Sequence, residues 1–98
     1  MASFSKARVL LVDDEPLVLE GLRRSLRTEF VTDLAGDAEE ALAKLRERPP
    51  YPVVVSDMHM PGMDGAKFLA AVRTISPDSI RVMLTGSSDM QAAVTIAF

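Results

Sequence analysis

Cysteine is absent from this sequence of 98 residues, so disulfide bonds, thiolate metal sites and cysteine nucleophiles are all excluded. An excess of basic residues is absent as well, because 11 lysines and arginines stand against 14 aspartates and glutamates and leave a net charge of −3. Proteins hold the phosphate backbone of nucleic acids through clustered lysine and arginine side chains. We therefore expect no direct contact with nucleic acid.

Long apolar segments are also missing. No run approaches the roughly 20 apolar residues of a membrane-spanning helix, and residues 1–8 lack the apolar core of a signal peptide. A cytoplasmic protein without membrane contact is expected. The hydrophobic fraction of 48% is sufficient for a packed core, and no linker or repeat divides the chain. Residues 1–98 are therefore predicted to be a single domain.

Short apolar runs alternate with amphipathic segments along the chain. This alternation is typical of a parallel α/β sheet covered by helices. The apolar runs predict strands at residues 9–12, 30–35, 53–55 and 80–84. A helix is predicted after each strand, and the last one begins at Met90 and continues to Phe98.

Acidic residues and prolines mark the starts of these helices. Pro16 suits the first turn of the first helix, because proline is tolerated there. Asp37, followed three residues later by Glu40, has the form of a capping box. Asp64 precedes the third helix, and we interpret it as an N-cap rather than as a metal ligand.

Three aspartates at the ends of strands are the candidate functional residues. Asp13 and Asp14 directly follow the first apolar run, and Asp57 follows the third. If these two strands lie side by side, their carboxyl ends bring the acids to one edge of the sheet. Because Mg2+ prefers hard oxygen ligands, this edge is predicted to be a divalent-cation site.

Three motifs in this order resemble the receiver domain of two-component response regulators. They are Asp13-Asp14 after the first strand, Asp57 with Met60-Pro61-Gly62-Met63-Asp64-Gly65 behind it, and Thr85 followed by Gly86 after the fourth strand. The resemblance covers residues 7–98. It implies an α/β fold, with a doubly wound parallel sheet of flavodoxin-like type and strand order 2-1-3-4-5.

The resemblance also implies roles for individual residues. Asp57 would be the phosphoacceptor, taking a phosphoryl group from a histidine kinase or a phosphotransfer protein. Asp13, Asp14, Asp57 and the backbone carbonyl of His59 would bind Mg2+, or Mn2+ in its place. Thr85 would donate its hydroxyl to a phosphoryl oxygen. The chain would then switch an output domain or partner, with at most autophosphorylation and autodephosphorylation activity.

The resemblance is incomplete at the C-terminus. A complete receiver has a fifth strand, a lysine on it that pairs with the phosphoryl group, and a fifth helix, and none of these can be placed in this sequence. Lys44 and Lys67 fall in predicted helices and cannot replace that lysine. We therefore expect a receiver with an exposed fourth strand, whose open edge and apolar final helix lead to self-association as a homodimer or larger species.

Two other classes of function stay open. A pseudo-receiver, which is not phosphorylated, would act as a protein-interaction module, although such proteins normally lose one of the acids. A haloacid-dehalogenase-like phosphatase also uses an aspartate nucleophile with Mg2+, but it needs Asp-x-Asp after the first strand. The segment Asp13-Asp14-Glu15 lacks that spacing.

Overall fold

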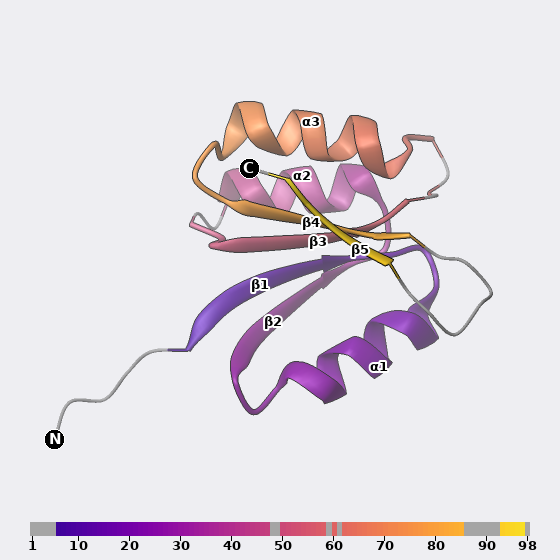
Figure 1. The fold of residues 1–98 in the computed structure, drawn as a ribbon, viewed down its shortest axis with the longest axis vertical. Coiled ribbons are helices and arrows are strands. Elements are labelled where there is room, and N and C mark those ends of the chain that lie inside the picture. The colour runs from indigo at the N-terminus through magenta and orange to yellow at the C-terminus, as the bar shows by residue number, and fades with distance from the viewer. Residues whose placement is uncertain (1–5, 48–49, 59, 61, 86–92, 98) are drawn as a thin grey trace, which may run out of the picture.

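The parallel strands form from the four apolar runs, since continuous apolar segments suit strands that are covered on both faces. The computed structural model describes residues 6–47, 50–58, 60, 62–85 and 93–97. The strands are β1 (Ala7–Val12), β2 (Phe30–Ala35), β3 (Val53–Asp57) and β4 (Ile80–Thr85), with a further strand, β5 (Ala93–Ala97). They make one sheet of order β2-β1-β3-β4-β5, in which β1 to β4 are parallel (Figure 1). The predicted α/β sheet is confirmed.

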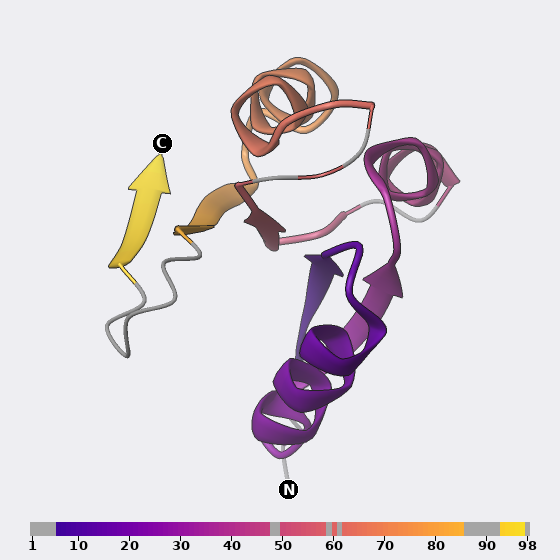
Figure 2. The same cartoon turned by 90° about the vertical axis from the view of Figure 1, so that its right-hand side faces the viewer.

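Helices lie on both faces of this sheet. They are α1 (Pro16–Leu26), α2 (Ala38–Glu47) and α3 (Gly65–Ile75). Figure 2 shows α1 on one side of the sheet and α2 and α3 together on the other. The first helix packs on β1 and β2, whereas α3 packs on β3 and β4. In the described part of the chain, no helix has the length and hydropathy needed to span a bilayer.

The helix starts follow the predicted capping. The Asp37 carboxylate accepts the Glu40 N–H at 2.8 Å, and the Asp64 carboxylate accepts the Lys67 N–H at 2.8 Å. Asp64 is therefore the N-cap of α3, as predicted. The Glu40 side chain accepts the N–H of Gly36 at 3.1 Å rather than that of Asp37, so the capping box is displaced by one residue.

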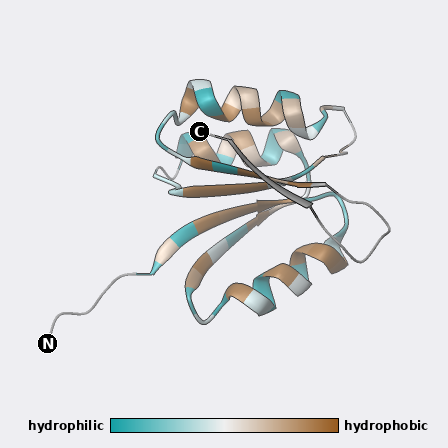
Figure 3. Ribbon diagram, viewed as in Figure 1, coloured by the Kyte–Doolittle hydropathy of each residue, from teal (hydrophilic) through white to brown (hydrophobic). Residues whose placement is uncertain are grey.

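Two apolar clusters hold the layers together. Leu10, Val54 and Phe68, each fully buried, belong to the larger cluster beneath α2 and α3. Val9 and Leu11 point to the opposite face and pack with Leu19 of α1. This alternation along β1 is the two-residue period of a strand buried on both sides, and β3, the neighbour of β1 in the sheet, is brown along most of its length in Figure 3.

The prediction of a helix over residues 90–98 is wrong for residues 93–97, which form β5; residues 90–92 and 98 lie outside the described part of the chain. This strand is antiparallel to β4, with Thr85 opposite Ala93 and Arg81 opposite Ala97. Its centre is β-branched, and pairing satisfies backbone groups that β4 would otherwise expose at its edge. The expectation of an open fourth strand is therefore also wrong.

Candidate functional site

The structure brings the three predicted carboxylates together at the carboxyl edge of the sheet. Val12 on β1 is paired with Ser56 on β3, so the next residues, Asp13 and Asp57, follow side by side at the carboxyl ends of these strands. One carboxylate oxygen from each of Asp13, Asp14 and Asp57 lies within 4.8 Å of the other two. Oxygen atoms at this spacing can share one cation, and the role of these residues as metal ligands stays a prediction.

Asp13 is the buried member of the cluster, with 6% of its surface exposed. Its N–H donates to the carbonyl oxygen of Ala35 at 3.1 Å, which ties it to the end of β2. Its Oδ1 accepts the N–H of Glu15 at 2.8 Å. The backbone on both sides therefore holds this carboxylate in place.

Burial is the main reason why the pKa of Asp13 is raised, from 3.8 to about 6. The negative charges of Asp57, Asp14 and Glu15 raise this pKa further, whereas the hydrogen bond from the Glu15 N–H lowers it. Negative charge at Asp13 is thus unfavourable in the folded protein. A cation or a proton bound there relieves the unfavourable charge.

Asp57 is half-buried at the last position of β3. Its Oδ1 accepts the N–H of Met58 at 2.8 Å, and the same N–H lies 3.2 Å from the carbonyl oxygen of Leu84 on β4. Among the described residues, no hydrogen bond is donated to Oδ2 of Asp57. One oxygen of this carboxylate is therefore held by the backbone, and the other is available to a ligand.

The remaining predicted site residues are placed only in part. Thr85 ends β4, one residue beyond Leu84, which is paired with Asp57; its backbone therefore lies at the same edge of the sheet. His59, whose carbonyl was predicted as a ligand, lies outside the described residues, as does Gly86. Lys44 donates to the carbonyl oxygen of Leu34 and pairs with Glu40 at 3.5 Å, so it is engaged on the β2 side of the molecule.

Sequence reasoning missed the contribution of Gly65, which enters only as the last residue of the motif that follows Asp57. Gly62, in the same motif, has a φ of 84°, which is unfavourable for other residues. Gly65, in contrast, is the first residue of α3 and packs against the backbone of Asp57. The signal was its position directly after the N-cap Asp64.

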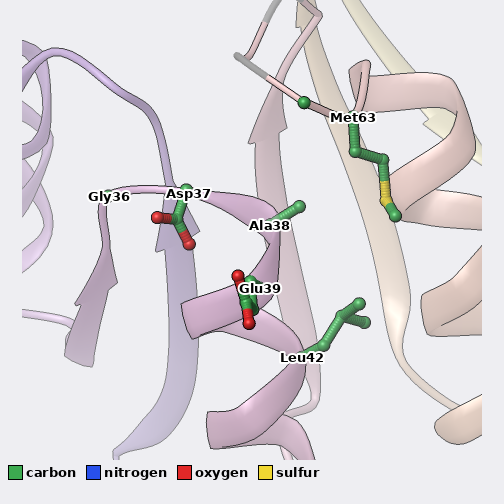
Figure 4. Close-up of a pocket in the computed structure, with 7 residues that line it drawn as sticks. Gly36, Asp37, Ala38, Glu39, Leu42 and Met63 are labelled. Atoms are coloured by element: carbon green, nitrogen blue, oxygen red, sulfur yellow. The ribbon is translucent and has the colours of Figure 1, made fainter.

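A hollow of about 500 Å³ lies between the start of α2 and the loop before α3. It is lined by Gly36, Asp37, Ala38, Glu39, Leu42, Gly62 and Met63. Figure 4 shows Met63 and Leu42 extending toward this space from the two sides. None of the three clustered aspartates lines it, so it is separate from the candidate metal site.

Comparisons with known proteins agree with this architecture. A family model described as "Response regulator receiver domain" matches residues 9–97. The hydrogenase transcriptional regulatory protein HoxA of Cupriavidus necator is 39% identical over 89 residues, covering 91% of this chain and 18% of that protein. The probable transcriptional regulatory protein NarL of Mycobacterium tuberculosis is 37% identical over 91 residues, covering 91% of this chain and 42% of that protein. The chain spans less than half the length of these relatives.

Solved structures show the same fold. The signal receiver domain of an HD domain-containing protein from Pseudomonas fluorescens matches with a TM-score of 0.80 and 33% identity, over 88% of this chain and 69% of that chain. The chemotaxis response regulator CheY4 of Vibrio cholerae matches with a TM-score of 0.77 and 32% identity, over 87% of this chain and 72% of that chain. With the family model covering most of its length, the chain belongs to the response regulator receiver domains.

Proposed function

We propose that this chain accepts a phosphoryl group on Asp57, in the presence of Mg2+, from a phosphohistidine on a histidine kinase or phosphotransfer protein. The observation that carries the proposal is the convergence of Asp13, Asp14 and Asp57 within 4.8 Å at the carboxyl edge of the sheet. Ligands of doubly wound sheets bind at this edge. Membership of the receiver family supports the assignment of Asp57 as the acceptor.

The cluster suits a small divalent cation. All three side chains offer carboxylate oxygens, which are the ligands that Mg2+ and Mn2+ prefer. The raised pKa of Asp13 supports cation binding, because it reports an unfavourable concentration of negative charge. The carbonyl of His59 is proposed as a further ligand from the family resemblance. Bound Mg2+ would neutralise the charge that a phosphoryl group brings to this edge.

The proposed step is a phosphoryl transfer between an imidazole and a carboxylate. An oxygen of Asp57 attacks phosphorus, an O–P bond forms, the P–N bond breaks, and the imidazole of the donor keeps that electron pair. The N–H of Met58, 2.8 Å from Oδ1 of Asp57, fixes the carboxylate so that Oδ2 is free to attack. Thr85, at the end of the neighbouring strand, is proposed to donate its hydroxyl to a phosphoryl oxygen.

The proposed consequence of phosphorylation is a change in an output domain or partner. The relatives that carry this domain include proteins named as transcriptional regulators, and the chain corresponds to 18% of one and 42% of another. For this chain, the output and the kinase are proposals that rest on those relatives, as is a cytoplasmic location. The chain itself is proposed to make no contact with nucleic acid or membrane.

Incubation of the chain with acetyl phosphate and Mg2+ tests the proposal. Intact-protein mass spectrometry should show the gain of one phosphoryl group, which hydroxylamine removes, since an acyl phosphate is sensitive to that nucleophile. Asp57→Asn should gain none, and a chelator should prevent the gain in the wild type. A pseudo-receiver predicts no labelling at all, and persistent labelling of Asp57→Asn would place the chemistry at another residue.

A further inference from the structure

Gly65 lies directly against the strand end that carries the proposed phosphoacceptor. A Cβ atom at this position would overlap the carbonyl oxygen of Asp57 and would lie 2.9 Å from the Cα of Met58. Only Gly62 has a positive φ among the described glycines, so Gly65 adopts a backbone conformation open to any residue. The requirement for glycine here is therefore one of space, because α3 begins in contact with the Asp57–Met58 peptide.

Hydrogen bonds connect this contact to the carboxylate of Asp57. The N–H of Gly65 donates to the carbonyl oxygen of Met58 at 2.8 Å. The N–H of Met58 in turn donates to Oδ1 of Asp57 at 2.8 Å and lies 3.2 Å from the carbonyl oxygen of Leu84. Residue 58 is thus held from α3 on one side and from β4 on the other, and it passes that constraint to Asp57.

We infer that Gly65 is a positioning residue for Asp57. By lacking a side chain, it lets the first turn of α3 approach closely enough for its N–H to hold Met58, whose own N–H fixes one oxygen of the Asp57 carboxylate. This hydrogen bond sets the orientation of the carboxylate, one oxygen of which lies within 4.8 Å of carboxylate oxygens of Asp13 and Asp14. This inference rests on the proposed function only where it concerns phosphorylation; the effect on Met58 is independent of it.

The N-cap of α3 contributes to the same arrangement. Asp64 accepts the N–H of Lys67 at 2.8 Å, and its own carbonyl accepts the N–H of Phe68 at 3.0 Å. These bonds fix the first turn, and with it the direction of the Gly65 N–H. Asp64→Ala therefore loosens the contact without adding an atom, whereas Gly65→Ala forces the two backbones apart.

The test compares Gly65→Ala with the wild type and two matched controls in the 98-residue chain. Gly21→Ala adds the same methyl group to a helix where nothing lies within 4 Å of it. Val72→Ala removes a fully buried side chain from α3 and so weakens the packing of the same helix at a distance from Asp57. Each variant is assayed at a temperature at which circular dichroism shows it folded.

The first readout is the initial rate at which acetyl phosphate transfers its phosphoryl group to Asp57 and releases acetate, measured over a range of Mg2+ concentrations. Relief of the overlap moves the backbones apart by about 1 Å, and a displacement of that size lowers a rate by about 100-fold. Gly65→Ala should show this loss, Asp64→Ala a smaller one, and both controls the wild-type rate per folded molecule.

The second readout is hydrogen exchange of the Met58 amide, followed by NMR without phosphodonor. Gly65→Ala should accelerate this exchange, and Val72→Ala should not.

A wild-type rate of phosphorylation together with unchanged amide exchange in Gly65→Ala overturns the inference. An equal loss of rate in Val72→Ala also overturns it, because helix packing then explains the effect. If Gly65→Ala does not fold, Asp64→Ala decides by the same two readouts. If the wild type takes no phosphoryl group, the proposed function fails, and amide exchange alone decides the positioning role.

Discussion

Replacement of Asp13 by asparagine should stabilise the metal-free protein at neutral and alkaline pH. Asparagine has the shape of aspartate, and its Oδ1 can still accept the Glu15 N–H that Asp13 accepts at 2.8 Å. Its amide group donates hydrogen bonds, and the carboxylates of Asp14 and Asp57 lie within 4.8 Å of the position as acceptors. The substitution therefore removes an unfavourable buried charge without leaving the site unpaired.

The magnitude follows from the pKa of Asp13, which folding raises from 3.8 to about 6. Because the folded state binds this proton more tightly than the unfolded state, ionisation of Asp13 disfavours folding. The penalty is absent below pH 3.8, grows between that value and about 6, and is complete above it. A difference of about 2 in pKa corresponds to about 3 kcal/mol, which is the upper limit for the gain in Asp13→Asn.

Urea unfolding followed by circular dichroism, in the presence of a chelator, measures this gain. The free energy of unfolding of Asp13→Asn should exceed that of the wild type by up to about 3 kcal/mol at pH 8, and the two should converge at about pH 4. Asp64→Asn is the matched control, since it changes an exposed N-cap to another good N-cap and should leave stability nearly unchanged. A less stable Asp13→Asn at pH 8, or a difference that does not vary with pH, would refute the reasoning.

Three further outcomes are expected. Mg2+ should stabilise the wild type by mass action, and Asp14→Ala should abolish this effect; equal heat of binding to that variant in calorimetry contradicts the ligand assignment. Phe68→Ala should lower the free energy of unfolding by about 3 to 5 kcal/mol, because Phe68 is fully buried, whereas Leu17→Ala, at a position 88% exposed, should change it little in the same urea assay. The chain should self-associate at micromolar concentration, because, among the described residues, α1 contacts β1 and β2 but not β3 or β4, so that Ile80 is 40% exposed and Val53, Val55 and Val82 are only partly buried; a stable monomer in sedimentation would contradict this.

Most of the fold could be predicted because local patterns and long-range packing agree in the first four strands. A run such as Val9–Val12 has no polar residue to place in water, so it must lie between two layers, and the amphipathic segments that follow supply those layers. The N-cap residues Asp37 and Asp64 predicted the starts of α2 and α3 to within one residue.

The last strand could not be predicted from the same patterns. Residues 93–97 contain alanine at both ends and β-branched residues between them, a composition compatible with either a helix or a strand. The outcome depends on the edge of β4, which offers backbone partners that no local pattern reveals. The pairing with β4 therefore determined the structure of residues 93–97, against the helix predicted from their local pattern.

The site was predictable in its residues but not in its energetics. Strand ends and spacing were enough to expect Asp13, Asp14 and Asp57 at one edge, because adjacent parallel strands end together. The burial of Asp13 depends on a contact with Ala35 at the end of β2, and the role of Gly65 depends on how closely α3 approaches Asp57. Both are distances between segments far apart in the sequence, which spacing along the chain does not determine.

The energetics of the site connect its stability to its chemistry. The burial and mutual repulsion that raise the pKa of Asp13 destabilise the folded protein whenever the cluster is fully ionised. Protonation of Asp13, its replacement by asparagine and the binding of a divalent cation each remove this unfavourable charge energy. Any one of the three is therefore sufficient. Metal affinity should therefore weaken as pH falls through about 6, at the pH where protonation begins to replace the cation. A cluster arranged only for folding would not place an ionised carboxylate at position 13, since neutralising Asp13 makes the metal-free fold more stable.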